Sequence, residues 1–151
     1  MTPEPNDPFP GAKEIAEGQL RSLNELLERI IPANPFYARK IANSSIPRAF
    51  DTLEAFSKMF PFTSKQELAH DQHQHPLHGR NLTFPLEEYS RMHQTSGTTG
   101  KPLRWLDTPQ TWEMLIECWL EVYRAAGVTR KDVAYFAFSF GPFLGFWLAF
   151  E

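Results

Sequence analysis

The sequence predicts an α/β fold, and two neighbouring patterns carry that prediction. From Thr108 to Gly127 apolar residues recur at the spacing of one helix face. After the turn "GVTRKD", the run from Val133 to Phe138 is uninterrupted apolar, which is typical of a strand covered on both faces. An amphipathic helix followed by a buried strand indicates a layer of helices packed on a sheet.

The chain is expected to begin with a disordered tail over residues 1–12. Prolines at several positions between 1 and 11 remove backbone donors and restrict helix formation: Pro3, Pro5, Pro8 and Pro10. Between Lys13 and Ile31 apolar residues recur three and four positions apart, which predicts an amphipathic helix ended by Pro32.

Shorter helices are expected to complete a helical region over residues 13–86. One covers residues 35–42, and another covers residues 52–59 with Asp51 as its N-cap. Two pairs have the spacing of a capping box that would open a further short helix, and the sequence does not choose between them: Thr63 with Gln66, and Ser64 with Glu67.

Polar residues dominate between positions 70 and 85, which predicts a surface loop. Four histidines fall in this stretch: His70, His73, His75 and His78. A zinc site is one interpretation, but no cysteine joins them and their spacing does not match a structural finger. Solvated histidines are therefore favoured, and no metal ligand is assigned.

Residues 87–151 are expected to start an α/β core. Alternation over residues 88–94 predicts a strand, and residues 103–107 predict a second one. Thr108 followed by Pro109 is an N-cap and first-turn signal, so the helix that ends before Gly127 is predicted to start there.

Between the two strands lies a glycine loop that is suited to bind an anion. It comprises Thr95, Ser96, Gly97, Thr98, Thr99, Gly100, Lys101 and Pro102. Backbone amides in a tight loop, hydroxyl donors and a lysine together suit a polyphosphate. The P-loop pattern is not met, because Thr95 stands five positions before Gly100 and Pro102 follows Lys101. The dinucleotide fingerprint also fails, since the loop has only two glycines.

The loop resembles the phosphate-binding motif of the adenylate-forming enzymes, the acyl-CoA synthetase superfamily. Its Gly-Lys-Pro ending, with Arg91 and His93 just upstream, is similar to the phenylacetate-CoA ligase branch. Flanking stretches also resemble that branch: "FPFTSKQEL" before the loop and "YRAAGVTRKDVAYFAFSFGPFLGFW" after it. The resemblance runs from about Lys13 to the end and implies the first helices and strands of an N-terminal AMP-binding domain, incomplete.

The resemblance implies an ATP-dependent ligase with Mg²⁺ and coenzyme A as cofactors. A carboxylic acid would form an acyl-adenylate and then a thioester. Hydroxyls of Thr95, Ser96, Thr98 and Thr99 would donate to ATP phosphates, the two glycines would permit close approach, and Lys101 would add charge. Two roles stay equally open for His93: it would contact phosphate or substrate, or it would only form a structural hydrogen bond.

The resemblance also implies that the aromatic segment near the end lines an acyl pocket. Its candidate residues are Phe138, Phe140, Gly141, Phe143 and Gly145. Rings there suit a flat aryl acid such as phenylacetate, whereas the alternative is simple core packing, and both interpretations stay open. The later motifs of the family, with an acidic magnesium partner and a catalytic lysine, have no counterpart in this sequence. We therefore expect a truncated chain that is inactive as an isolated ligase.

Composition excludes several other classes. The chain has 15 basic and 18 acidic residues and a net charge of −3, which argues against nucleic-acid binding. Its only cysteine, Cys118, has no intrachain partner, and its first residues lack a signal peptide, so a cytoplasmic protein is expected. No stretch approaches the roughly 20 apolar residues that span a bilayer. The alternatives are a non-catalytic nucleotide-binding or anion-binding module and a truncated remnant without function.

Overall fold

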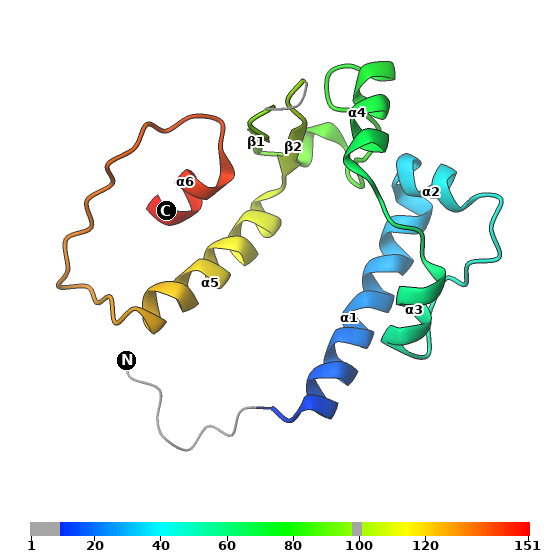
Figure 1. Ribbon diagram of the computed structural model, residues 1–151, viewed down its shortest axis with the longest axis horizontal. Helices are drawn as coiled ribbons and strands as arrows, with labels where there is room; N and C mark the ends of the chain where they lie inside the picture. Colours follow the sequence, from blue (N-terminus) through cyan, green and yellow to red (C-terminus); the bar gives the residue numbers. More distant parts are fainter. Residues whose placement is uncertain (1–9, 98–100) are drawn as a thin grey trace. The chain divides into compact units, whose positions relative to one another are not determined.

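The structure, a computed structural model, describes residues 10–97 and 101–151. It consists of helices and one small sheet, and it divides into two compact units, Met1–Thr63 and Ser64–Glu151 (Figure 1). Each unit is described by itself below. No described helix has the length and apolar character needed to cross a membrane.

The first unit contains three helices that the sequence predicted, α1 (Ala12–Ala33), α2 (Pro35–Ile41) and α3 (Leu53–Met59). The expected bounds of α1 were wrong at both ends, because Ala12 belongs to the helix and not to the tail, and the helix continues through Pro32 to Ala33. The expected N-cap of α3, Asp51, was wrong by one residue. Thr52 takes that position, because its hydroxyl oxygen accepts the Ala55 N–H at 3.0 Å.

The core of the first unit forms where α1 meets the segment before α3. Leu27, Ile31 and Phe50 are buried together, and each buried side chain of this size contributes roughly 1.5–3 kcal/mol. The Asn24 side chain fixes the crossing segment, since it accepts the Phe50 N–H and donates to the Phe50 carbonyl, both at 2.9 Å. Helices α2 and α3 both lie against α1 (Figure 1).

The second unit begins with α4 (Lys65–Gln74), and here the capping alternatives are settled. Ser64 and Glu67 form the capping box: Ser64 N donates to Glu67 Oε2 at 2.7 Å, and Glu67 N donates to Ser64 Oγ at 3.2 Å. The expected surface loop from residue 70 was wrong in its first part, because α4 continues to Gln74. Only one side of α4 is covered, so most of its residues are polar and the apolar spacing of a helix is absent from the sequence.

The remainder of the 70–85 stretch is held by a buried carboxylate. Asp71 is 5% exposed and accepts the Arg80 N–H at 2.5 Å and the Arg80 Nε–H at 3.1 Å. Gly79 precedes that arginine with φ +76°, a conformation that glycine adopts without strain. A short 3₁₀ turn, η1 (Leu86–Glu88), then leads to the sheet.

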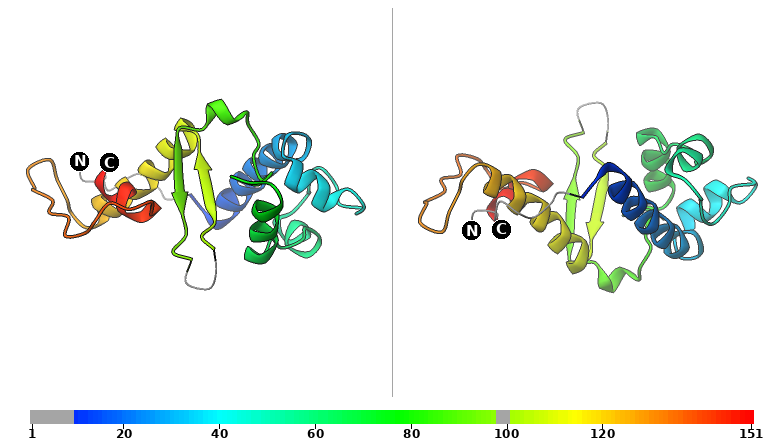
Figure 2. Two further views of the ribbon diagram at one scale, coloured as in Figure 1. Left: turned by 90° about the horizontal axis from the view of Figure 1, so that it is seen from above. Right: turned by 90° about the horizontal axis from the view of Figure 1, so that it is seen from below.

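The sheet is a two-stranded antiparallel hairpin of β1 (Arg91–Gln94) and β2 (Arg104–Asp107), seen from two sides in Figure 2. Both strands were predicted, although η1 takes the first residue of the expected β1. In the register, Arg91 lies opposite Asp107 and Gln94 lies opposite Arg104.

Helix α5 (Pro109–Ala125) follows β2 directly and starts as predicted. Thr108 Oγ1 accepts the Thr111 N–H at 3.2 Å, and Pro109 fills the first helical position, where no backbone donor is needed. Gly127 leaves the helix with φ +74°.

The expected strand over residues 133–138 was wrong. These residues form no strand, and the side chains of Val133 and Tyr135 are 94% and 90% exposed. A strand needs backbone partners, and no described segment pairs with this one. Helix α6 (Leu144–Phe150) was not predicted, since glycine and aromatic residues there indicated a loop. It lies against α5, and the Tyr123 hydroxyl donates to the Ala149 carbonyl.

The turn before this segment is closed by an exposed aspartate. The Thr129 hydroxyl and backbone N–H donate to Asp132 Oδ2 at 2.8 and 2.7 Å. These two hydrogen bonds, from the side chain first and the backbone second, lower the pKa of Asp132.

The geometry at Gly79 predicts a large effect of a single methyl group. In Gly79→Ala the new Cβ would lie 2.6 Å from Asp71 Oδ2. This clash adds to the strain that the positive φ imposes on any side chain. Gly127→Ala is the matched control, because its φ is similar but no atom lies within 4 Å. We expect Gly127→Ala to cost about 1–2 kcal/mol and Gly79→Ala at least about 1 kcal/mol more. Urea unfolding followed by tryptophan fluorescence measures the second unit alone, and equal costs would contradict the Asp71 contact.

Candidate functional site

One edge of the hairpin is bound by the side chain of Gln72, which pairs with the backbone of β2 as a neighbouring strand would. The Gln72 amide of α4 donates to the Arg104 carbonyl at 2.7 Å and accepts the Arg104 N–H at 3.0 Å. The Arg104 guanidinium donates back to the Leu77 carbonyl at 2.9 Å. The edge of β2 is therefore satisfied, and the hairpin that carries the glycine loop has a fixed support.

The neck of the glycine loop is closed by Thr95. Its N–H donates to the Leu103 carbonyl at 3.0 Å, and its hydroxyl oxygen accepts the Leu103 N–H at 3.0 Å. Leu103 is 3% exposed, which buries this joint. The Thr95 amide is thus used inside the hairpin, whereas its hydroxyl hydrogen remains as a donor.

Beyond the neck the described loop residues face solvent or turn sharply. Ser96 and Lys101 are exposed, and Gly97 has φ +67°. A side chain at Gly97 would be strained in this conformation. Three of the predicted phosphate-binding residues, Thr98, Thr99 and Gly100, lie outside the described residues.

A cavity of about 430 Å³ lies beside the loop and carries basic side chains. Lys101 comes from the loop, Arg104 from β2 and His73 from α4. The rest of its lining is Ala69, Gln72, Pro76, Gln94, Pro102 and Leu103. Basic groups on one wall of a cleft attract anions, so the cavity extends the anion-binding character of the loop.

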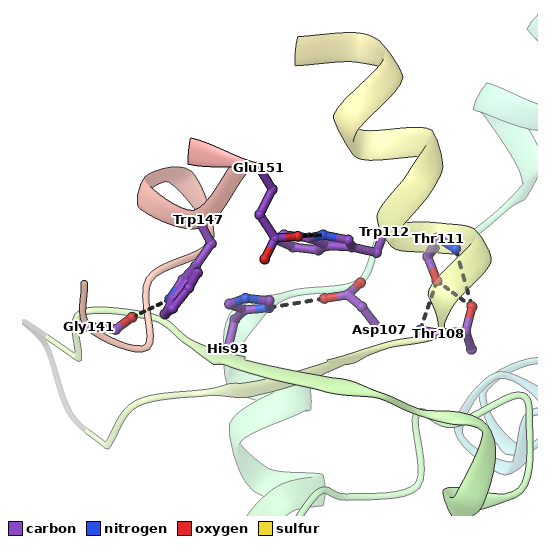
Figure 3. Close-up of polar contacts among 8 residues, drawn as sticks. All are labelled: His93, Asp107, Thr108, Thr111, Trp112, Gly141, Trp147 and Glu151. Carbon is purple, nitrogen blue, oxygen red and sulfur yellow. Dashed lines mark hydrogen bonds and ion pairs between the residues drawn. The ribbon is translucent and has the colours of Figure 1, made fainter. Parts of the chain in front are cut away.

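On the other side of the hairpin, His93 is locked between a carboxylate and a ring. Its Nδ1 lies 3.2 Å from Asp107 Oδ2, and its ring stacks on Trp112 at 5.1 Å with an interplanar angle of 11°. The His93 side chain is 6% exposed. This contact joins β1, β2 and the first turn of α5 (Figure 3).

The same Trp112 is tied to the residue that follows α6. Trp112 Nε1 donates to Glu151 Oε2 at 2.6 Å, and the Arg91 guanidinium donates to the same oxygen at 2.7 Å. Arg91 also lies over the indole ring, 4.4 Å from its centroid. Charge-assisted bonds of this kind are stronger than neutral ones.

A second cavity, of about 460 Å³, opens where this cluster meets the aromatic segment. Its lining comprises Arg91, Met92, His93, Phe140, Gly141, Pro142 and Trp147. Two hydrogen bonds shape the wall: Gln94 N donates to the Pro142 carbonyl at 2.7 Å, and Trp147 Nε1 donates to the Gly141 carbonyl at 2.8 Å. The cavity is open to solvent, and its lining combines the polar groups of Arg91 and His93 with the rings of Phe140 and Trp147.

The predicted acyl-pocket residues divide into two groups. Phe140 and Gly141 line the second cavity. Phe138 instead stacks on Phe146 of α6 at 4.5 Å, and Phe143 packs edge-on against the same ring. Gly145 lies within α6.

Sequence reasoning named His93 as a candidate contact to phosphate or substrate but did not place it with Arg91 in the wall of this cavity. Arg91 and His93 stand two positions apart on β1 and both line it. Because alternate residues of a strand point to one face, that spacing was a usable signal. Trp147 was missed for another reason, since it belongs to a helix that the sequence did not predict.

The chain matches proteins named phenylacetate-coenzyme A ligase. It is 30% identical over 142 residues to the one from Thermus thermophilus, covering 90% of this chain and 31% of the relative. It is 31% identical over 133 residues to the one from Escherichia coli K12, covering 87% of this chain and 29% of the relative. The chain thus spans under a third of the length of these curated relatives. No family model matches it.

The fold matches solved structures of 2-hydroxyisobutyryl-CoA ligase. One structure, in complex with 2-HIB-AMP and CoA in the thioesterification state, aligns with a TM-score of 0.84 and 26% identity over 92% of this chain and 29% of that chain. Another, in the postadenylation state with 2-HIB-AMP, has a TM-score of 0.82 at 24% identity. The mixed helix and small-sheet fold is therefore that of the N-terminal part of adenylate-forming ligases.

The two tryptophans of α5 provide a matched test of the Glu151 contact. Trp112→Phe keeps a ring against His93 but removes the hydrogen bond to a carboxylate, so we expect a loss of about 1.5–3 kcal/mol in the free energy of unfolding. Trp119 Nε1 is buried without a partner among the described residues, so Trp119→Phe should cost clearly less. Denaturant unfolding followed by circular dichroism measures both. An equal loss in the two variants would refute the role of the Trp112 bond.

Proposed function

Because the chain is homologous to the phenylacetate-coenzyme A ligases of the adenylate-forming superfamily, we propose that it is part of an ATP-dependent acid–CoA ligase. In the proposed reaction the carboxylate of an acid attacks the α-phosphate of ATP and releases pyrophosphate. The thiolate of coenzyme A then attacks the acyl carbon and displaces AMP. ATP and coenzyme A are abundant in the cytoplasm, which is where we expect the protein to act.

The observation that carries this proposal is the glycine loop held at its neck beside a basic cavity. The Thr95–Leu103 bonds close the hairpin, and Ser96 and Lys101 stay exposed beyond it. Fixed amides, hydroxyls and a cation stabilise the charge that develops on the leaving pyrophosphate. We assign ATP phosphate binding to the loop from Thr95 to Lys101, including its residues outside the described part.

The described residues fit the phosphates of ATP better than a free metal ion. Lys101 and Arg104 around the first cavity supply positive charge for an anion, and the His73 ring lies in the same lining. In the described ranges no group of three His, Cys, Asp or Glu side chains is placed to hold a metal. Mg²⁺ would therefore arrive bound to ATP, and its chemistry is to neutralise charge on the phosphate oxygens.

We assign the acid to the second cavity, with Phe140 and Gly141 in its wall. Phe138, Phe143 and Gly145 support this wall through the packing of α6. The rings of Phe140 and Trp147 in the lining favour an acid with an aromatic body, such as the phenylacetate named in the relatives. The relatives in known structures are named for a hydroxylated acid instead.

A second function, binding of a nucleotide or anion without acyl transfer, would use the loop and the basic cavity alone. Acid-dependent exchange of pyrophosphate into ATP separates the two functions, since exchange requires reversible formation of the acyl-adenylate. A protein that contains this chain together with the later motifs of the relatives should exchange pyrophosphate only when an acid is added. Tight ATP binding without acid-dependent exchange would support the binding module instead.

Removing single hydroxyl groups from the loop tests its assignment to ATP phosphates. Ser96→Ala removes a hydroxyl from the proposed phosphate site, and Thr98→Ala removes another. Each lost hydrogen bond to a charged phosphate should weaken ATP binding by about 1.5–3 kcal/mol. Ser90→Ala is the control, because Ser90 is exposed next to the opposite end of the hairpin. Calorimetric titration with Mg·ATP measures the effect, and unchanged affinity in both loop variants would rule out the assignment.

A further inference from the structure

His93 presents a nitrogen that the fold itself does not use. An aspartate carboxylate only accepts hydrogen bonds, so the contact between His93 Nδ1 and Asp107 Oδ2 places the proton of the neutral ring on Nδ1. Nε2 then carries a lone pair. The stack on Trp112 holds the ring in this orientation, so the ring cannot turn to exchange its two nitrogens without losing both contacts.

No hydrogen bond reaches this lone pair from the described residues. The His93 side chain as a whole is 6% exposed. The ring borders the second cavity, and Figure 3 shows its edge opposite Asp107 turned toward the side of Trp147. Nε2 is not one of the buried atoms that lack a partner in the described residues, so it is open to the cavity, where a ligand donor can reach it.

Two other acceptors in the lining are already occupied. The Gly141 carbonyl accepts from Trp147 Nε1, and the Pro142 carbonyl accepts from Gln94 N. The positive charge of Arg91 is met by Glu151. Met92, Phe140 and Trp147 offer mainly apolar surface. His93 Nε2 is therefore an acceptor with a fixed orientation that a donor group of a ligand in this cavity can reach.

We propose that His93 determines the specificity of this cavity by accepting a hydrogen bond from a hydroxyl group of the acid. The ligand class is a hydroxylated acid with an aromatic or branched apolar body. Asp107 acts as a positioning residue, because it selects the tautomer of His93. This inference rests on the proposed function for the identity of the ligand as an acid, and it narrows the acid to a hydroxylated one.

Equilibrium binding tests the inference without requiring turnover. The natural protein is titrated at pH 8 with phenylacetate, mandelate and 4-hydroxyphenylacetate, and the fluorescence of Trp147 in the cavity wall reports binding. At least one hydroxylated acid should bind roughly two- to twelve-fold more tightly than phenylacetate, the range expected of one hydrogen bond. If neither hydroxylated acid binds more tightly than phenylacetate, the inference is overturned.

Variants then assign the preference to His93. His93→Phe keeps a ring on Trp112 and should bind phenylacetate as before while losing the preference for the hydroxyl. His93→Leu removes both ring nitrogens and should also abolish the preference. His70→Phe, at an exposed position of α4, should keep it. Should His93→Phe fail to fold, His93→Leu decides, and a preference that survives the folded variant refutes the role of His93.

Failure of the inference differs from failure of the proposed function. A protein that exchanges pyrophosphate with phenylacetate and with hydroxylated acids equally well retains its ligase assignment but loses the His93 role. A protein that binds hydroxylated acids through His93 but exchanges no pyrophosphate with any acid loses the ligase assignment.

Discussion

The stack of His93 on Trp112 is the contact on which the second unit depends. It joins a strand to a helix that starts after the partner strand, and Asp107 and Glu151 each bind one of the two rings. Because both rings are nearly buried, each polar edge needs its partner, and a carboxylate supplies it in both cases. The hairpin, α5 and the end of α6 are therefore held by one cluster rather than by an extended apolar core.

The hairpin separates two chemical environments. At the end of the hairpin that carries the glycine loop, Thr95 closes the neck of the loop. The basic cavity beside the loop suits phosphate. On its flank, His93 borders a cavity that also carries the rings of Phe140 and Trp147, which suits an acid with an aromatic body. A ligase that joins an acid to the α-phosphate of ATP needs these two environments close together, and β1 contributes residues to both.

How far the sequence predicts this arrangement depends on how local each signal is. The helices with caps, such as the one at Thr108, and the strands around the loop were predicted because neighbouring residues determine them. The conformation of the segment from Val133 was not predicted correctly. A strand forms only with a partner, and sequence periodicity cannot identify that partner. The site shows the same limit: the loop was recognised from its residue order, whereas Trp147 reaches the cavity through α6, whose tertiary packing overrides its glycine and aromatic composition.

The central claim is that the loop beyond Thr95 binds the phosphates of ATP. Titration of ¹⁵N-labelled protein with Mg·ATP, followed by amide chemical shifts, tests it most directly. The account predicts that the largest shifts fall on Ser96, Gly97 and Lys101 and on the basic cavity next to them, while amides of the first unit stay unchanged. Saturable binding whose shifts fall elsewhere, or no shift at millimolar Mg·ATP, would contradict it.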